Sequence, residues 1–112
     1  MKVMVISILL ALFPVNVYAI SGNELVKSMR DYDKYAAGNG DFKQSSMGMY
    51  VGYVSGIFEA MRIGRVICPN QAVVNGQAIE IVSGYIKSNP EKWDLDAINL
   101  VYTPLILTFP CR

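Results

Sequence analysis

The feature that most constrains the fold is a stripe of apolar residues between positions 47 and 61. These residues recur every three or four positions, which is the spacing of one buried face of an α-helix. The stripe consists of Met47, Tyr50, Val51, Val54, Ile57, Phe58 and Met61. It predicts a long helix that ends before the segment Gly64–Asn70, where Cys68-Pro69-Asn70 favours a turn.

A second stripe in the same segment is made of small residues spaced by four, namely Gly48, Gly52, Gly56 and Ala60. Each glycine costs a helix about 1 kcal/mol relative to alanine, so the ridge indicates that another helix comes close to this face. We expect that helix to belong to the same domain. A contact between two subunits is the alternative, and the ridge alone does not distinguish the two.

A shorter amphipathic helix is predicted on each side of the long one. The first follows Ser21-Gly22-Asn23, which suit a helix start, and ends before a turn over residues 36–41. Its apolar face contains Leu25, Val26, Met29 and Tyr32. The other begins at about Asn75 or Gly76 and ends at Ser88-Asn89-Pro90. Its apolar face contains Ala78, Ile81, Val82, Tyr85 and Ile86.

A fourth helix is predicted near the carboxyl end. Asp94 can cap it, and Asp96 then lies in its first turn, where the helix dipole favours a negative charge. Pro104 should kink or interrupt the helix, because proline cannot donate a hydrogen bond to the carbonyl of Leu100. We expect residues 105–109 to form a helix end rather than a strand, since no partner strand is predicted. The apolar side contains Ile98, Val101, Tyr102, Leu105 and Phe109.

Together these patterns predict an all-α fold, a small bundle of four or more helices closed by one disulfide. Cys68 and Cys111 are the two cysteines of the chain, which leaves one pairing. The crosslink would close a loop of roughly 44 residues and contribute about 4 kcal/mol on chain-entropy grounds. A redox pair or a metal site is the alternative, but the cysteines lack CxxC spacing and the chain has no histidine.

The first residues have the layout of a secretory signal. Met1-Lys2 gives a positive start, an apolar run extends to Phe13, and Val17-Tyr18-Ala19 suits a signal peptidase. We therefore expect residues 1–19 to be a cleaved signal peptide and residues 20–112 to be one exported domain in an oxidising compartment, the periplasm. An uncleaved membrane anchor is the alternative, although the apolar run is short for a membrane span.

Removal of this segment would leave the domain without net charge. The chain has ten basic and nine acidic residues, and the loss of Lys2 leaves nine of each. A neutral domain has no electrostatic attraction to nucleic acid or to an anionic membrane surface, so we expect neither as a partner. Low charge also favours association between copies, because little repulsion keeps them apart.

The chain lacks the patterns of a catalytic site. Without histidine it has neither the usual base for nucleophilic catalysis nor the commonest metal ligand, so we expect no enzyme activity, metal or cofactor. No GxSxG or SxxK motif frames a serine, and the glycines form no Walker loop. We interpret the pairs Asp31/Asp33 and Asp94/Asp96 as surface and capping residues, and Glu59, Arg62 and Arg65 as a solvated face.

Several short motifs follow one another in a characteristic order. They are Gly52-Tyr53-Val54-x-Gly56-Ile57, Ile67-Cys68-Pro69, a helix from Gln77 that ends in Tyr85-Ile86-Lys87-Ser88-Asn89-Pro90-Glu91, and a terminal Phe109-Pro110-Cys111. This series resembles the Rap/Tai family of immunity proteins associated with type VI secretion, over roughly residues 22 to 111. The order, the spacing and the final Phe-Pro-Cys together carry the resemblance.

The resemblance implies a periplasmic, helical and often dimeric protein that binds a cell-wall amidase effector and covers its cysteine–histidine active site. Such an inhibitor needs no chemistry of its own. Family members commonly carry another cysteine pair at about the places that Met29 and Tyr50 occupy here, and we expect packing to replace it. Pro104 also departs from the family pattern, in a segment that would bear on partner specificity if it faces the partner.

Two turn-rich segments are candidates for partner contact, on exposure and composition alone. The candidates are Gly38, Asn39, Gly40 and Asp41 in the first segment, and Asn70, Gln71, Asn75 and Gly76 in the second. Ordinary solvated loops are the alternative for both segments. The alternative function is that of a periplasmic acid-stress chaperone, which is also small, exported, helical and closed by one disulfide, and which loosens at low pH to expose apolar surface.

Overall fold

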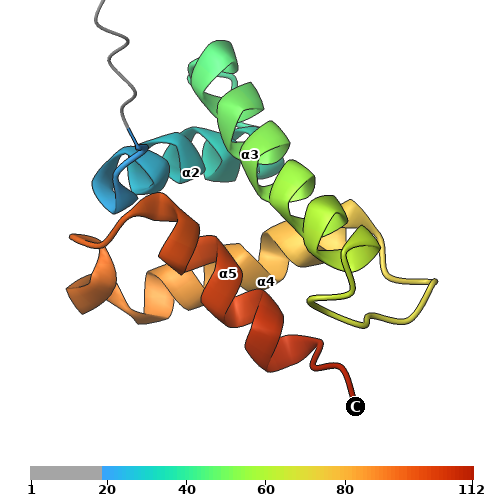
Figure 1. Cartoon of the computed structure of the whole chain (residues 1–112). Helices are drawn as coiled ribbons and strands as arrows, with labels where there is room; N and C mark the ends of the chain where they lie inside the picture. The colour runs from blue at the N-terminus through green and yellow to red at the C-terminus, as the bar shows by residue number, and fades with distance from the viewer. Residues whose placement is uncertain (1–18) are drawn as a thin grey trace, which may run out of the picture.

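The computed structural model describes residues 19–112 and contains four α-helices in this part of the chain (Figure 1). They are α2 (Gly22–Ala36), α3 (Gln44–Ile63), α4 (Asn75–Ser88) and α5 (Ala97–Thr108), with a short 3-10 helix, η2 (Pro90–Lys92), before the last. No strand is present within residues 19–112. The predicted all-α class is therefore confirmed. The predicted signal peptide lies, apart from Ala19, outside the described residues.

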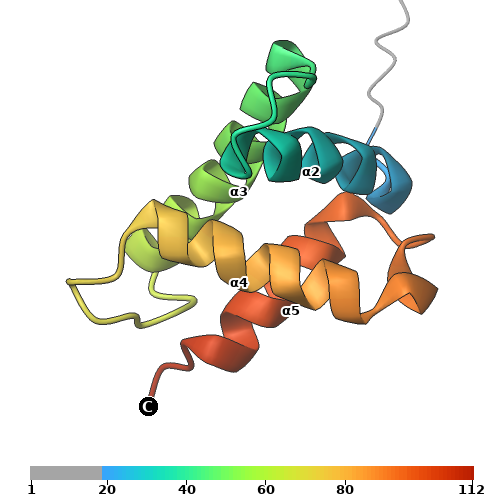
Figure 2. The ribbon, with the colours of Figure 1, turned by 180° about the vertical axis from the view of Figure 1, so that it is seen from behind.

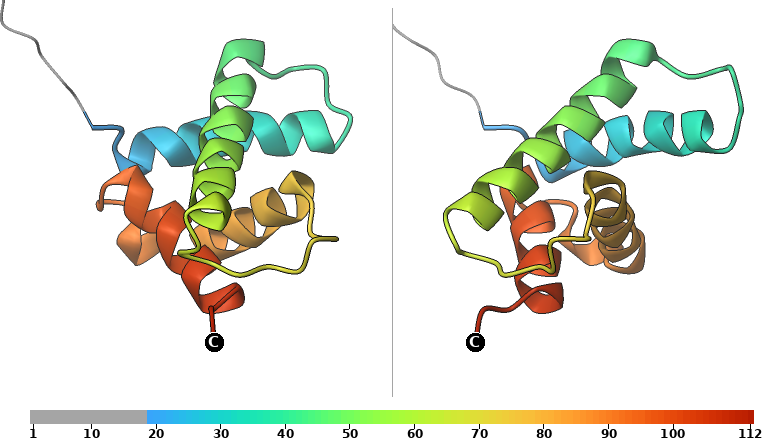
Figure 3. Two further views of the ribbon diagram at one scale, coloured as in Figure 1. Left: turned by 45° about the vertical axis from the view of Figure 1, so that its right-hand side comes forward. Right: turned by 90° about the vertical axis from the view of Figure 1, so that its right-hand side faces the viewer.

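The helices cross one another steeply instead of lining up as an aligned bundle. Seen from behind, α2 and α4 form the nearer layer, and α3 and α5 cross them on the far side (Figure 2). The left view of Figure 3 shows the same crossing, with α3 passing over α2 and α5 over α4. The core lies where these layers meet.

Each of the four α-helices contributes buried apolar side chains to one core. In α3 these are Tyr50, Val54, Phe58 and Met61, which confirms the stripe predicted for that helix. Met29 and Tyr50, at which we expected packing in place of a second cysteine pair, are 3% and 0% exposed and belong to the same core. The other buried apolar residues are Leu25, Val26, Ile67, Ala78, Ile79, Val82, Ile86, Ala97, Leu100, Val101 and Leu105.

The start of α2 is fixed by a side-chain cap and by a contact with the far end of the chain. Ser21 caps the helix, as predicted, because its hydroxyl accepts a hydrogen bond from the backbone nitrogen of Glu24 at 3.1 Å. Ser21 also forms an isolated antiparallel bridge with Asp96. In this bridge Gly22 N donates to Leu95 O at 2.7 Å, and Ala97 N donates to Ile20 O at 2.9 Å. The bridge therefore sets where both α2 and α5 begin.

This bridge explains why the predicted start of the fourth helix is wrong. Asp96, and not Asp94, precedes the first residue of α5, and the helix has no acidic residue in its first turn. Asp96 is held in an extended conformation by the bridge to Ser21, which delays the helix to Ala97. The apolar face is displaced as well, since Ile98 and Tyr102 are each 44% exposed. The residues that α5 buries are Ala97, Leu100, Val101, Pro104 and Leu105.

Pro104 does not interrupt the last helix. The helix continues through Pro104 to Thr108. Leu100, one turn before the proline, and Leu105, directly after it, are fully buried in the core. Burial of these neighbours stabilises a helix that has lost one backbone donor at the proline. The helical end predicted for this segment is confirmed.

The predicted disulfide joins Cys68 and Cys111, whose Cα atoms are 4.8 Å apart. Beside it, Cys68 N donates a hydrogen bond to Phe109 O at 3.0 Å. The carboxyl-terminal end therefore lies against the loop that follows α3, and Phe109 packs on the core residue Phe58 with ring centroids 6.0 Å apart.

Candidate partner-binding surfaces

The first predicted contact segment, residues 38–41, forms an exposed loop between α2 and α3. Gly38 adopts a φ of 75°, a left-handed conformation that suits glycine at the end of α2. The side-chain oxygen of Asn39 then accepts a hydrogen bond from Asp41 N at 2.9 Å. Beyond the loop, Lys43 N donates to Asp31 Oδ1 at 3.1 Å, and this hydrogen bond lowers the pKa of Asp31. These interactions shape the loop without any partner.

The second predicted segment is divided between a loop and a helix. Asn70 and Gln71 are exposed on the loop after α3, where Asn70 Oδ1 accepts a hydrogen bond from Ala72 N at 2.9 Å. Asn75 and Gly76 belong instead to the first turn of α4. Asn75 uses its side chain inside the domain, because its Nδ2 donates to Glu59 Oε1 of α3 at 3.0 Å.

The structure does not bring the two segments together. They lie at opposite ends of α3 (Figure 3), a helix of 20 residues, which corresponds to a length of about 30 Å. A toxin active site covered by one of these loops would therefore not be covered by the other in the same copy. The two segments are separate candidate surfaces.

The ridge of small residues in α3 faces solvent, so the prediction that it packs inside the domain is wrong. A side chain added at Gly48, Gly52 or Gly56 would meet nothing within 4 Å, and Ala60 is exposed. The buried stripe that contains Tyr50 and Val54 turns the ridge to the opposite side of the helix. The remaining exposed residues of this outer face are Gln44, Ser45, Met49, Glu59 and Ile63, of which Glu59 is the one charged residue.

A hollow of about 460 Å³ opens at the carboxyl end of α3, beside the disulfide. It is lined by Arg62, Ile63, Arg65, Ile67, Cys68, Pro69 and Gln71. The sequence pattern assigned its two arginines to a plain solvated face and therefore missed it. The surface is concave there only because the chain folds back at Ile67 and is held by the disulfide. Helical periodicity does not indicate where a chain folds back.

The backbone at the edge of this hollow has an unusual conformation. Arg65 has a φ of 56°, and among residues 19–112 it is the one non-glycine residue with a positive φ. It lies just beyond the end of α3, where Val66 N donates to Met61 O at 2.9 Å and Arg65 N donates to Arg62 O at 3.2 Å. This arrangement commonly has glycine at the position of Arg65, because a side chain there is strained.

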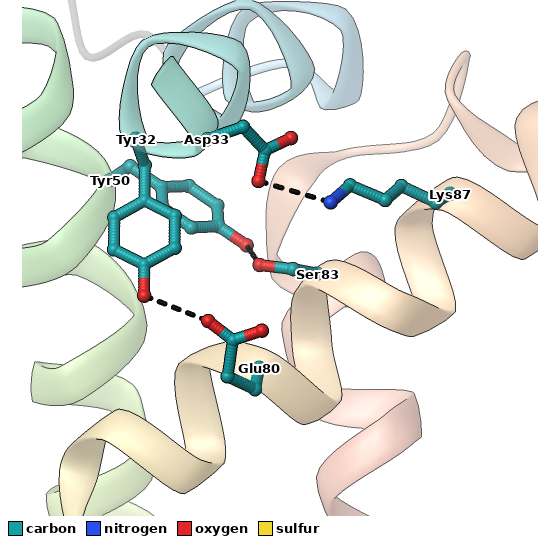
Figure 4. A network of polar contacts seen from close by, with 6 residues as sticks. All are labelled: Tyr32, Asp33, Tyr50, Glu80, Ser83 and Lys87. Carbon is teal, nitrogen blue, oxygen red and sulfur yellow. Dashed lines mark hydrogen bonds and ion pairs between the residues drawn. The ribbon is translucent and has the colours of Figure 1, made fainter. Parts of the chain in front are cut away.

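A polar network ties three helices, α2, α3 and α4, together (Figure 4). The buried hydroxyls of Tyr50 and Ser83 are 2.6 Å apart, and Tyr32 donates to Glu80 at 2.9 Å. At the surface, Lys87 Nζ lies 3.0 Å from Asp33 Oδ1. Burial raises the pKa of Tyr32 to about 12 and raises that of Tyr50 further, so both phenols stay neutral hydrogen-bonding groups. The network joins α2, α3 and α4, and we interpret its role as stabilising the packing of these helices.

Residues 19–112 contain no cluster of three or more residues suited to hold a metal ion. Within the same residues, no helix is long and apolar enough to cross a membrane. The candidate partner-binding surfaces are the two loops, the outer face of α3 and the hollow with its two arginines.

Comparison with known proteins identifies one family. The model of the family described as Rap1a immunity proteins matches residues 21–111, which include all four helices and both cysteines. No curated protein and no solved structure matches the chain. Membership of an immunity family implies that a protein toxin is the partner, and such families are typically not catalytic. Because the match spans most of the 112 residues, this chain belongs to the family of Rap1a immunity proteins.

Proposed function

We propose that this protein is exported to the periplasm, where it binds a type VI-secreted amidase that degrades the cell wall and blocks the active site of that toxin. The family match over residues 21–111 carries the proposal. The secretory pattern of residues 1–19 and the Cys68–Cys111 disulfide support the location, since disulfides persist in oxidising compartments.

The end of α3 with its following loop has the composition of a protein interface. Large apolar side chains are unusually exposed here, with exposed fractions of 80% for Ile63, 42% for Val66 and 61% for Val74. Arg62 and Arg65 lie beside them, and arginine is enriched both in protein interfaces and among the residues that dominate binding energy. We therefore favour the loop with Asn70 and Gln71 over the loop at Gly38–Asp41 as the part that enters the groove of the amidase.

The outer face of α3 supports a further part of the proposal, a homodimer. Small residues at positions 48, 52, 56 and 60 would let two helices approach to backbone distance. This face carries one charge, and that carboxylate, Glu59, is already hydrogen-bonded to Asn75.

The acid-stress chaperone has less support from the structure. Acid loosening requires carboxylates whose protonation breaks the fold. Among residues 19–112 the buried polar residues are Ser28 and Ser83, and no carboxylate is buried. The ion pair of Asp33 with Lys87 is half-exposed and contributes little to stability.

Protection of living cells tests the proposed function. Bacteria that export a papain-like type VI amidase to their periplasm should lyse, and co-expression of the full chain should restore growth. A version lacking residues 1–19 should fail to protect, because it stays on the wrong side of the membrane from the toxin. Equal lysis with and without the full chain, for every amidase subtype tested, would contradict the proposal.

A further inference from the structure

The hollow at the end of α3 combines positive charge with an apolar floor. Its rim carries the guanidinium groups of Arg62 and Arg65 and the side-chain amide of Gln71. Its floor includes Ile67, which is 1% exposed, and Pro69. All three polar side chains are hydrogen-bond donors, and none of the lining residues is acidic.

Neither arginine has an acidic partner in the described chain. Within residues 19–112, the only pair of opposite charges closer than 4.0 Å is Lys87 with Asp33, on other helices. The nearest acidic residue along the helix, Glu59, is hydrogen-bonded to Asn75. The guanidinium of Arg62 lies over the ring of Phe58 at 5.6 Å, a cation–π contact that positions the guanidinium without using its hydrogen-bond donors.

Arg65 occupies a position where the fold itself would favour another residue. A positive charge near the end of a helix stabilises the dipole, and Arg62 in the last turn already supplies one. Glycine at position 65 would relieve the left-handed backbone, whereas arginine strains it. Strain of this kind persists at sites where the side chain has a function.

We propose that this hollow receives an acidic side chain, Asp or Glu, of a protein partner, held between the guanidinium groups of Arg62 and Arg65. The inference rests on the proposed function, which takes that partner to be the amidase. Arginine binds carboxylates through paired, charge-assisted hydrogen bonds, and the apolar floor excludes water from that contact. The hollow is then the anchor that places the adjoining Asn70–Gln71 loop.

Charge-removing variants of the protein purified from the periplasm after expression of the full chain test this inference. The probe is a purified amidase that the unaltered protein inhibits. Arg62→Gln and Arg65→Gln should each weaken binding about tenfold or more, and the double variant should weaken it further. The double variant should also lose most of the salt dependence of the association rate. Lys27→Gln, which removes the same charge from the exposed side of α2, should bind like the unaltered protein.

A glycine variant separates a binding role from a structural one. Arg65→Gly should raise Tm by about 4 °C by removing the strain, and should nevertheless weaken binding as much as Arg65→Gln. Unchanged affinity of the double variant for an amidase that the unaltered protein inhibits would overturn the inference and leave the proposed function standing. If an arginine variant binds more weakly only because it is partly unfolded, as a lowered Tm would show, the inference would be overturned as well.

If no amidase is inhibited, the proposed function fails, and a second measurement then tests the inference about the hollow independently. The probe is then the peptide acetyl-Glu-Leu-Glu-amide, and its binding is measured from changes in the nitrogen and proton NMR signals of the protein. The side-chain signals of Arg62 and Arg65 should shift saturably, and acetyl-Gln-Leu-Gln-amide should not shift them. Shifts that are absent, or equal for the two peptides, would overturn the inference.

Discussion

Gly22 lies where the start of α2 passes against the chain that leads into α5. A side chain at this position would overlap the carbonyl oxygens of Trp93 and Leu95, which are backbone atoms and cannot turn away. At the residue scale, this glycine therefore has a stricter role than the glycines of α3, although the sequence pattern drew attention to the latter.

We expect Gly22→Ala to destabilise the fold by about 2 kcal/mol, because the bridge between Ser21 and Asp96 must open to make room. Urea denaturation measures the change. Gly84→Ala is the matched control, since it adds the same methyl group to α4 where nothing lies within 4 Å, and it should stabilise the helix by up to about 1 kcal/mol. A similar loss for both variants would contradict the close approach at Gly22.

The buried phenol of Tyr50 predicts how stability changes at high pH. In the unfolded chain a tyrosine ionises near its usual pKa of 10.0, whereas burial raises the pKa of Tyr50 in the folded protein and that of Tyr32 to about 12. Above pH 10 the unfolded state therefore holds fewer protons, and stability should fall as the pH rises through this window. Urea denaturation between pH 8 and about 11 measures the slope.

Tyr50→Phe is the control for this pH effect. It should lower stability at neutral pH by about 1 kcal/mol, because Ser83 is left buried without its partner, and it should flatten the decline above pH 10. An equally steep decline in this variant would show that another group causes it.

At the scale of elements, the sequence predicted the presence of the helices better than it predicted which elements pack against each helix. The stripe of α3 needed only helical periodicity, and the core confirmed it at Tyr50, Val54 and Phe58. The ridge on the same helix had no such guide, since a small residue permits a close approach but does not say which element makes it. The start of α5 was also beyond local patterns, because it depends on a bridge to Ser21, far away in the chain.

The candidate site was predicted only in part, for a related reason. Turn composition located the exposed loop residues Asn39 and Asn70, whose own side chains shape the turns. The hollow at the carboxyl end of α3 needs the disulfide and the return of the chain at Ile67. A concave surface made by segments that are distant in sequence leaves no periodic trace in either segment.

The outer face of α3 predicts the behaviour of the protein in solution. If this face is the dimer contact, the unaltered protein should be a dimer by light scattering at micromolar concentration, and Gly52→Glu should be a monomer, because it places a charge between two closely approaching helices. Gly84→Glu is the matched control on α4, where a side chain also meets nothing within 4 Å. A dimer that survives Gly52→Glu, or a monomeric unaltered protein, would contradict this contact.

At the scale of the whole molecule, the disulfide determines whether a domain this small is stable. It closes a loop between residues separated by 43 positions, and its removal should cost about 4 kcal/mol on chain-entropy grounds. That amount is comparable to the entire stability of a typical small domain. The oxidised protein should unfold in urea at a clearly higher concentration than the paired variant Cys68→Ser/Cys111→Ser.

Reduction provides the control for this effect. Dithiothreitol should lower the stability of the unaltered protein to that of the paired serine variant and should leave the variant unchanged. If reduction has no effect on the unaltered protein, the helical core stabilises the fold without the crosslink, and the estimate from loop closure is wrong for this chain.

The proposed function of the whole molecule is to bind and inhibit a toxin. The most direct test is to titrate the oxidised protein into purified papain-like type VI amidases at neutral pH and to follow cleavage of peptidoglycan. We predict complete inhibition of one amidase at a ratio of about one to one, with the nanomolar affinity typical of tight protein inhibitors. Undiminished cleavage by every amidase, together with suppression of the aggregation of many unrelated proteins at low pH, would contradict the account and favour a chaperone.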